Sequence, residues 1–243
     1  MAFAFTKEDI PQFRKWQRDL LGCAEFFWPD VRFSNQQRGF LEELNKIVSA
    51  KLKVGDLKDK LEAKVKKSGL KGDDIDNAVE KQLPAILDKK LDKEEKKYYR
   101  KIGVSVQSCN GSGKDFIAAC ITILFTLLYP NAKNSCTANT GQQLKVVLWA
   151  EISKLLRLSR KAQPDDKLTI LQQLLELQST KLFLREAQGK EWFTEAVTVN
   201  TSLGDEEQAE SIAGRHEDYQ VWVVDEGSNI GVPVFQKIER TLT

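Results

Sequence analysis

The chain has 243 residues, of which 41% are hydrophobic and 30% charged, and its formal net charge is +2. This length and composition predict one globular α/β domain, with or without an insertion, whose core needs no disulfide bonds. The four cysteines lack zinc-finger and redox spacing, which excludes those sites and is typical of reduced thiols in a cytoplasm. The longest apolar run, Phe116 to Tyr129, is too short to cross a bilayer, and no targeting peptide is visible.

The first 48 residues are predicted to be helical. Phe13, Trp16 and Leu20 recur at helical spacing, and residues 36–48 repeat the pattern. The tripeptide Trp28-Pro29-Asp30 separates the two helical stretches.

Residues 49–98 differ in composition from the rest of the chain. Residues 51–101 carry 16 Lys or Arg against 11 Asp or Glu, a local net charge of +5. A Lys-rich helix is expected to end near Ser68-Gly69, and Asp73 or Asp74 can cap a second helix that Pro84 bends or ends. This segment is therefore predicted to be a charged helical insertion.

From Lys101 onward the pattern alternates between strands and helices. Such alternation predicts α/β architecture with a mainly parallel sheet flanked by helices. The expected strands are residues 102–106, 192–200 and 221–224, and the expected helices are residues 116–128, 142–158 and 167–177.

A glycine-rich loop lies between the first of these strands and its helix, which is the context that a phosphate-binding loop requires. Its glycines let backbone N–H groups approach phosphates closely, and Lys114 would reach the β- and γ-phosphates. We expect the nucleotide to be bound by Asn110, Gly111, Ser112, Gly113, Lys114 and Asp115.

Two positions of the loop depart from the usual G-x-x-x-x-G-K-[ST] pattern. Ser108 replaces the first glycine, and Asp115 replaces the hydroxyl residue that normally ligates magnesium. A carboxylate can hold Mg²⁺ directly or through water, although it adds negative charge beside a triphosphate. By itself the loop is equally well explained as an ordinary Gly-rich helix start.

The apolar segment Val221–Val224 ends in Asp225 and Glu226, at the strand end where ligands bind in open α/β sheets. Asp225 would orient Mg²⁺ or its water, and Glu226 would polarise the water that attacks the γ-phosphate. The alternative is a strand followed by an acidic turn. The joint occurrence of the loop and this acidic strand favours an ATPase.

Several segments resemble the large terminase subunits of tailed phages, over residues 26–48 and 99–243 and in that family's order. In that family a Gly-x-His element precedes the acidic strand. The matching segments are Ala213-Gly214-Arg215-His216, Asp225 to Ile230, Phe235 to Thr243, Thr137-Ala138-Asn139-Thr140 with Gln142 or Gln143 and Trp149, and Phe33-Ser34-Asn35-Gln36. Gly227 and Asn139 depart from the usual Ala and Pro, and the insertion separates Gln36 from the loop more widely than expected.

The resemblance implies a P-loop NTPase fold of the RecA-like, ASCE type that uses ATP and Mg²⁺. Such an enzyme drives double-stranded DNA into a procapsid in the host cytoplasm, as a homo-oligomeric ring on a portal protein, guided by a small terminase subunit. Gln36 would recognise adenine. Arg215 is the candidate arginine finger, with Arg157, Arg160 and Arg185 as rivals and a solvated surface arginine as the alternative for each.

The expected organisation is an N-terminal helical, adenine-side segment at 1–48, the Lys-rich insertion at 49–98 and the P-loop ATPase core at 99–243. No nuclease domain or nuclease activity is expected in this chain. Turnover by the isolated chain is expected to be weak or absent, and a monomer is one expected state of the chain outside the assembled ring. The insertion either touches DNA phosphates or is a solvated helical pair. Two other functions stay open: a helicase-like DNA-dependent ATPase, and a catalytically degenerate nucleotide-binding assembly module.

Overall fold

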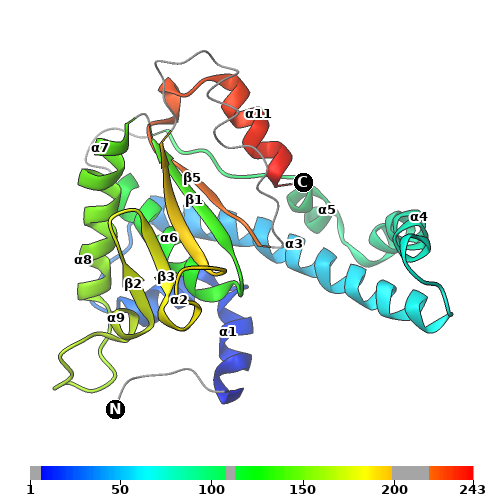
Figure 1. Cartoon of the computed structure of the whole chain (residues 1–243), viewed down its shortest axis with the longest axis horizontal. Coiled ribbons are helices and arrows are strands. Elements are labelled where there is room, and N and C mark those ends of the chain that lie inside the picture. Colours follow the sequence, from blue (N-terminus) through cyan, green and yellow to red (C-terminus); the bar gives the residue numbers. More distant parts are fainter. Residues whose placement is uncertain (1–6, 108–112, 139, 199–218, 243) are drawn as a thin grey trace.

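The computed structural model describes residues 7–107, 113–138, 140–198 and 219–242. They form an α/β fold around a five-stranded sheet of order β2-β3-β4-β1-β5, shown in Figure 1. The strands are β1 Lys133–Ala138, β2 Leu175–Leu177, β3 Lys181–Leu184, β4 Phe193–Thr198 and β5 Trp222–Val224.

The sheet is mixed, where a mainly parallel sheet was expected. β1 pairs in parallel with both β4 and β5, whereas β3 pairs antiparallel with both β2 and β4. The reason is local, because only residues 178–180 separate β2 from β3 and so short a connection permits only a hairpin. The parallel half of the sheet therefore consists of β4, β1 and β5.

The helices surround this sheet and extend from it. The α-helices are α1 Ile10–Trp16, α2 Leu20–Phe27, α3 Asn35–Lys67, α4 Asp73–Lys90, α5 Lys93–Tyr99, α6 Lys114–Leu128, α7 Gly141–Gln143, α8 Ala150–Leu158, α9 Ile170–Leu174 and α11 Val232–Thr241. Short 3₁₀ turns are η1 Lys7–Asp9, η3 Arg185–Ala187 and η4 Gly227–Asn229, and η2 Leu144–Trp149 is a π-helical segment that joins α7 to α8.

Helices cover both faces of the sheet. Val221, directly before β5, and Val223 face the main core that contains α6, whereas Trp222 and Val224 face a second cluster formed with Val234 and Ile238 of α11. Since successive strand residues point to opposite faces, α6 and α11 lie on opposite sides of the sheet.

The predicted helix 116–128 is confirmed as α6, which is buried on most of its faces. Its two hydroxyl side chains, Thr122 and Thr126, donate to the carbonyl oxygens of Ala118 and Thr122, four residues back, at 2.8 and 2.7 Å. Thr126 also shares a 2.6 Å hydrogen bond with Thr194 of β4. These bonds let a polar pair sit inside the core without an unsatisfied group.

The strand predicted at residues 102–106 is wrong, because these residues form no strand. Ile102 and Val106 remain 38% and 54% exposed. A strand needs a neighbour for its backbone groups, and among the described residues β5 pairs with β1 alone. The β-branched composition of residues 102–106 was therefore not sufficient to form a strand.

The helix predicted at residues 167–177 is only partly correct. α9 covers Ile170–Leu174, and Leu175–Leu177 then pair with β3 as β2. Long-range pairing outweighs the local helical pattern here. The expected helix over 142–158 is confirmed, although it contains the π-helical segment η2, and the strand at 221–224 is confirmed by β5. β4 confirms the strand predicted at 192–200 over residues 193–198, and residues 199 and 200 lie outside the described residues.

The predicted limit at residue 48 falls inside α3, which runs unbroken for 33 residues. α3 begins at a capping box formed by Ser34 and Gln37 and ends at Ser68, followed by Gly69 with φ +90°. α4 follows as expected, with Pro84 inside it rather than at its end. Segments 1–48 and 49–98 therefore share one helix, and the domain limits stay a prediction.

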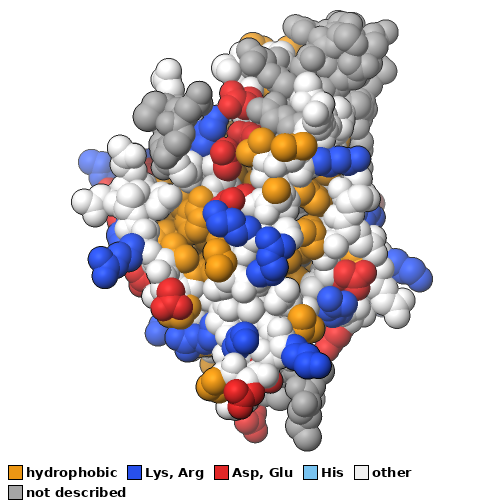
Figure 2. Space-filling view, turned by 90° about the vertical axis from the view of Figure 1, so that its left-hand side faces the viewer, with side chains coloured by type: hydrophobic (Ala, Val, Ile, Leu, Met, Phe, Trp, Pro, Cys, Tyr) orange, Lys and Arg blue, Asp and Glu red, His pale blue; other side chains and the backbone are white. Residues whose placement is uncertain are grey.

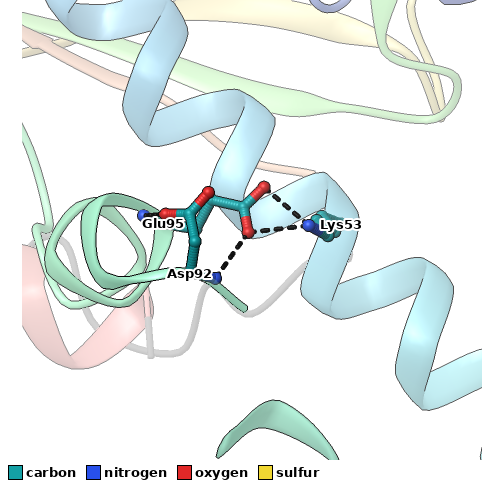
Figure 3. Close-up of polar contacts among 3 residues, drawn as sticks. All are labelled: Lys53, Asp92 and Glu95. Carbon is teal, nitrogen blue, oxygen red and sulfur yellow. Dashed lines mark hydrogen bonds and ion pairs between the residues drawn. The ribbon is translucent and has the colours of Figure 1, made fainter. Parts of the chain in front are cut away.

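α5 is attached to α3 by a charged contact, drawn in Figure 3. The Glu95 carboxylate accepts hydrogen bonds from Lys53 Nζ at 2.6 and 2.7 Å and from the backbone N–H of Asp92 at 3.0 Å. The Asp92 side chain in turn accepts from the Glu95 N–H, which completes a capping box. One acid thus caps α5 and joins it to α3.

None of the helices within the described ranges is both long and apolar enough to cross a membrane.

Candidate nucleotide-binding site

The site lies where β1 and β5 end, at one edge of the sheet, because the two strands are parallel. The Asp225 N–H donates to the carbonyl oxygen of Thr137 at 2.8 Å, so Asp225 continues the ladder by one step. Glu226 follows with φ +52°, and its N–H donates to Asp225 Oδ1 at 3.0 Å. The left-handed turn at Glu226 directs the chain away from the sheet immediately after the two acids.

Lys114 is brought to the same edge from far away in the sequence. As the first residue of α6 it forms an ion pair with Glu226. The hydrogen bond that Lys114 donates to Glu226, together with the charges of Glu226, Asp225 and Asp115, raises the pKa of Lys114 above its usual range. The fold thus joins the basic residue of the loop to the second acid of the strand.

Asp115 and Asp225 form the part of the site that suits a cation. Burial raises the pKa of Asp225 above its ordinary value, and the charge of Asp115 adds to this effect. Asp115 Oδ1 and Thr137 Oγ1 are both buried, and neither atom has a hydrogen-bond partner. Buried carboxylate oxygens that lack a partner fit a hard cation such as Mg²⁺, which prefers oxygen ligands.

A larger protein-based metal cluster is absent from the parts of the chain that the structure describes, where no group of three or more His, Cys, Asp or Glu side chains has suitable geometry. Two carboxylates are the donor set that a magnesium ion bound chiefly to phosphates would need. The metal-ligand roles of Asp115 and Asp225 stay predictions, and the unpartnered oxygen belongs to Asp115, since Asp225 Oδ1 accepts from the Glu226 N–H.

Gly113 has φ +82° and is the N-cap of α6, directly before Lys114. A Cβ at this position would lie 2.5 Å from the Nε2 atom of Gln37, so that side chain would have to shift, and the positive φ favours glycine. The Gln37 Oε1 atom accepts from the Ser34 N–H at 2.9 Å, which holds the amide in place.

Gln37 is therefore the glutamine next to the loop, whereas Gln36 is exposed. Sequence reasoning selected Gln36 and missed Gln37. The available signal was the capping box, because Ser followed three residues later by Gln marks a helix start whose Gln side chain folds back. The adenine role of Gln36 stays a prediction.

Several predicted site residues lie outside the described residues: Asn110, Gly111, Ser112, Arg215 and His216. The rival arginines make contacts of their own. Arg157 donates to Ser153 at 2.7 Å, the Arg160 guanidinium lies 4.6 Å from the ring centre of Phe26, and Arg185 pairs with Glu176 at 2.9 Å.

Trp149, one of the residues that resemble the terminase family, is buried at the end of η2. Its indole N–H donates to the Gln178 carbonyl oxygen at 3.0 Å, in the connection between β2 and β3. This bond fixes the π-helical segment to the antiparallel half of the sheet.

Figure 2 shows the side of the molecule that carries α8, with basic and acidic side chains next to one another in its upper part. At the site itself, the Lys114 ammonium group lies within the electrostatic influence of three carboxylates, those of Asp115, Asp225 and Glu226.

The chain is similar to a phage terminase protein. Over 139 residues it is 30% identical to a protein described as a probable terminase, large subunit, of Enterobacteria phage P7. The match covers 57% of this chain and 26% of the relative, so the chain spans about a quarter of the relative's length. No family model and no solved structure matches the chain.

Proposed function

We propose that this chain is the ATP-hydrolysing motor domain of a viral terminase large subunit, which drives double-stranded DNA into a procapsid. The observation that carries the proposal is the pairing of Lys114 with Glu226 at the carboxyl edge of the parallel strands. The similarity to a probable terminase large subunit supports the same conclusion.

Each charged group has a role in this proposal. Lys114 neutralises charge on the β- and γ-phosphates, while the backbone at Gly113 lets them approach the start of α6. Asp115 and Asp225 hold Mg²⁺, which when bound offsets charge on the phosphate oxygens. Glu226 orients the attacking water and accepts its proton.

The Lys114–Glu226 pair sets the order of events. Phosphate oxygens would compete with the Glu226 carboxylate for the three N–H donors of Lys114, and in this proposal triphosphate binding releases Glu226 from Lys114. The freed carboxylate then becomes available to the water. Arg215, from this chain or a neighbouring one, would stabilise charge on the transferred phosphoryl group. A ring on a portal protein, guided by a small terminase subunit, is the proposed assembly.

The proposal is tested by ATP hydrolysis with and without double-stranded DNA, for the wild type, Lys114→Ala and Glu226→Gln. Binding of a fluorescent ATP analogue is measured in parallel. We expect Lys114→Ala to lose binding and hydrolysis, and Glu226→Gln to keep binding and lose hydrolysis. Equal background hydrolysis by all three proteins would contradict the enzymatic role.

A second candidate is a nucleotide-binding assembly module that does not hydrolyse ATP. It is favoured by Asp115, whose carboxylate adds negative charge where a hydroxyl is usual. Under this alternative the wild type binds the analogue without turnover, at any DNA concentration. Asp115→Ser separates the two cases further, because a metal ligand role predicts a changed magnesium requirement for binding.

A further inference from the structure

Residues 57–90 form an arm that lies apart from the sheet. The arm consists of the last third of α3 and all of α4, and Figure 1 shows both at the side of the molecule away from the strands. Leu61, Val65 and Val79 are its buried residues, and every side chain packed against them comes from α3 or α4. The arm therefore has its own small core and contributes nothing to the main one.

A groove of about 720 Å³ runs between the two helices of the arm. Its apolar lining is Leu57 and Leu61 from α3 and Ala85 and Ile86 from α4. Leu57 and Leu61 are four residues apart, so they form a row along one side of the groove. Ala85 is exposed, and its small side chain keeps the groove open.

The charged side chains in the lining of the groove are all basic. Lys60, Lys64 and Lys81 are exposed and line it. Within the described ranges these three lysines have no ion pair, whereas other lysines of α3 pair with Glu95 and Glu62. Among the described residues the three ammonium groups are therefore unpaired by acidic side chains, and they are exposed to acidic groups of another molecule.

We propose that this groove binds an amphipathic helix with an acidic flank, supplied by a partner protein. Apolar side chains at positions i, i+3 or i+4, and i+7 of such a helix would enter the space between Leu57 and Ile86. Acidic residues beside that row would meet Lys60, Lys64 and Lys81, which orients the helix and speeds its association.

DNA fits the groove less well, although the segment is basic. Phosphates gain nothing from an apolar lining, because desolvating them beside leucine side chains is unfavourable. The tip of the arm also carries Asp73, Asp74 and Asp76 in the first turn of α4, where they would repel a polyanion. The inference is independent of ATP hydrolysis, since none of these residues belongs to the nucleotide site.

The test uses two labelled helical peptides that share one apolar row and carry either Glu or Lys beside it. Each is titrated with the intact chain, and binding is measured by fluorescence anisotropy. We expect the Glu peptide to bind at least ten-fold more tightly than the Lys peptide. Lys60→Glu with Lys64→Glu should weaken its binding at least ten-fold.

The matched control is Lys58→Glu with Lys71→Glu, which makes the same charge change at exposed arm residues outside the groove. Its expected effect on affinity is below three-fold. Ala85→Trp fills the groove without changing charge, and it should also weaken the Glu peptide at least ten-fold. Circular dichroism checks that each variant keeps its helices.

Three results would overturn the proposal. The first is no binding of the Glu peptide by the wild type. The second is an equal loss in the two double variants, which would indicate unspecific attraction, and the third is no effect of Ala85→Trp. A labelled DNA duplex is titrated alongside, and a loss of DNA binding in the Lys60 and Lys64 variant without peptide binding would assign the arm to DNA instead.

Discussion

The Glu226 carboxylate pairs with the Lys114 ammonium, the group that a triphosphate would need. Both side chains are partly accessible, at 29% for Lys114 and 35% for Glu226. Ion pairs of this exposure contribute about 0.2–1 kcal/mol, so a phosphate with several negative charges can displace the carboxylate. Under the proposed function, the contact would therefore weaken nucleotide binding without preventing it.

Glu226→Gln is expected to tighten binding of a fluorescent ATP analogue by about two- to five-fold, which corresponds to the free energy of a partly exposed ion pair. The reason is that a neutral amide competes less well for Lys114. Glu186→Gln, at an exposed acid of η3, is the control and should leave affinity unchanged. Weaker binding of the analogue by Glu226→Gln would show that the pair does not compete with phosphate.

Asp225 predicts a pH-dependent stability. Burial and the charge of Asp115 raise the pKa of Asp225 above the ordinary value of 3.8. Folding therefore favours the neutral carboxyl, so the charged form lowers the free energy of unfolding. This loss of stability is absent below pH 3.8 and is complete at pH values above the raised pKa. Removing the charge should stabilise the protein at neutral pH and not in acid.

Asp225→Asn, measured without Mg²⁺ or nucleotide, is expected to raise Tm by about 1–3 °C at pH 7.5. The gain should shrink as the pH falls toward 4. Asp59→Asn, at an exposed position of α3, is the control. An increase in Tm that does not depend on pH, or a decrease in Tm at pH 7.5, would contradict the conclusion that the charged Asp225 side chain destabilises the folded protein.

At the site, the types of side chain could be predicted from the sequence, and their partners only in part. Lys114, Asp225 and Glu226 were expected at one site because a loop before a helix and the end of an apolar strand are adjacent in α/β folds. The direct pairing of Lys114 with Glu226 was not expected. Gln37 was missed because which of two adjacent glutamines faces the loop depends on the exact start of α3.

Among the elements, the small helix α5 depends on one acid more than on any other. Glu95 accepts hydrogen bonds from Lys53 and from the Asp92 N–H, so it completes the cap and the attachment to α3 together (Figure 3). The packing of Tyr98 against Ile47 and Ala50 then holds the helix on α3.

Glu95→Ala is expected to lower the free energy of unfolding by about 1 kcal/mol, because it removes the helix cap and a partly exposed ion pair. For a chain of this size that lowers Tm by about 2–4 °C. Glu94→Ala is the matched control, because Glu94 lies in the same first turn and is exposed. Equal shifts in thermal unfolding for the two variants would mean that the contacts of Glu95 contribute nothing beyond helix propensity.

The elements that sequence reasoning found are those whose own residues determine them. α6 is apolar on most faces and β5 is fully apolar, so each is recognisable without its neighbours. β1 was missed because Asn134, Ser135 and Thr137 are unusual in a buried strand. The fold satisfies only the oxygen of the Asn134 amide, since Oδ1 accepts from the Val221 N–H at 3.0 Å whereas the buried Nδ2 has no hydrogen-bond partner.

At the scale of the whole molecule, the main core and the arm are separate packing units. The main core joins α2, α6, α8 and the sheet, whereas the arm has only the cluster around Leu61, Val65 and Val79. A small cluster stabilises its helices less than a large core does, so the arm should open locally while the sheet stays folded.

Amide hydrogen exchange, followed by mass spectrometry, should therefore be at least about ten-fold faster in α4 than in α6. Val79→Ala removes a buried contact of the arm and is expected to speed exchange in α4 without changing it in α6. Ala63→Gly, at an exposed position of α3, tests for a general effect of weakening the helix. Uniform exchange across α4 and α6 would show that the chain unfolds as one unit.

The continuity of α3 has a mechanical consequence. The helix starts with Gln37 beside Gly113 and ends 30 residues later in the arm, a rise of roughly 45 Å at 1.5 Å per residue. A tilt of about 5° at its first turn would displace the far end by about 4 Å. A displacement of Gln37 that tilted α3 as a rigid rod would therefore be larger at the groove between α3 and α4 than at Gly113.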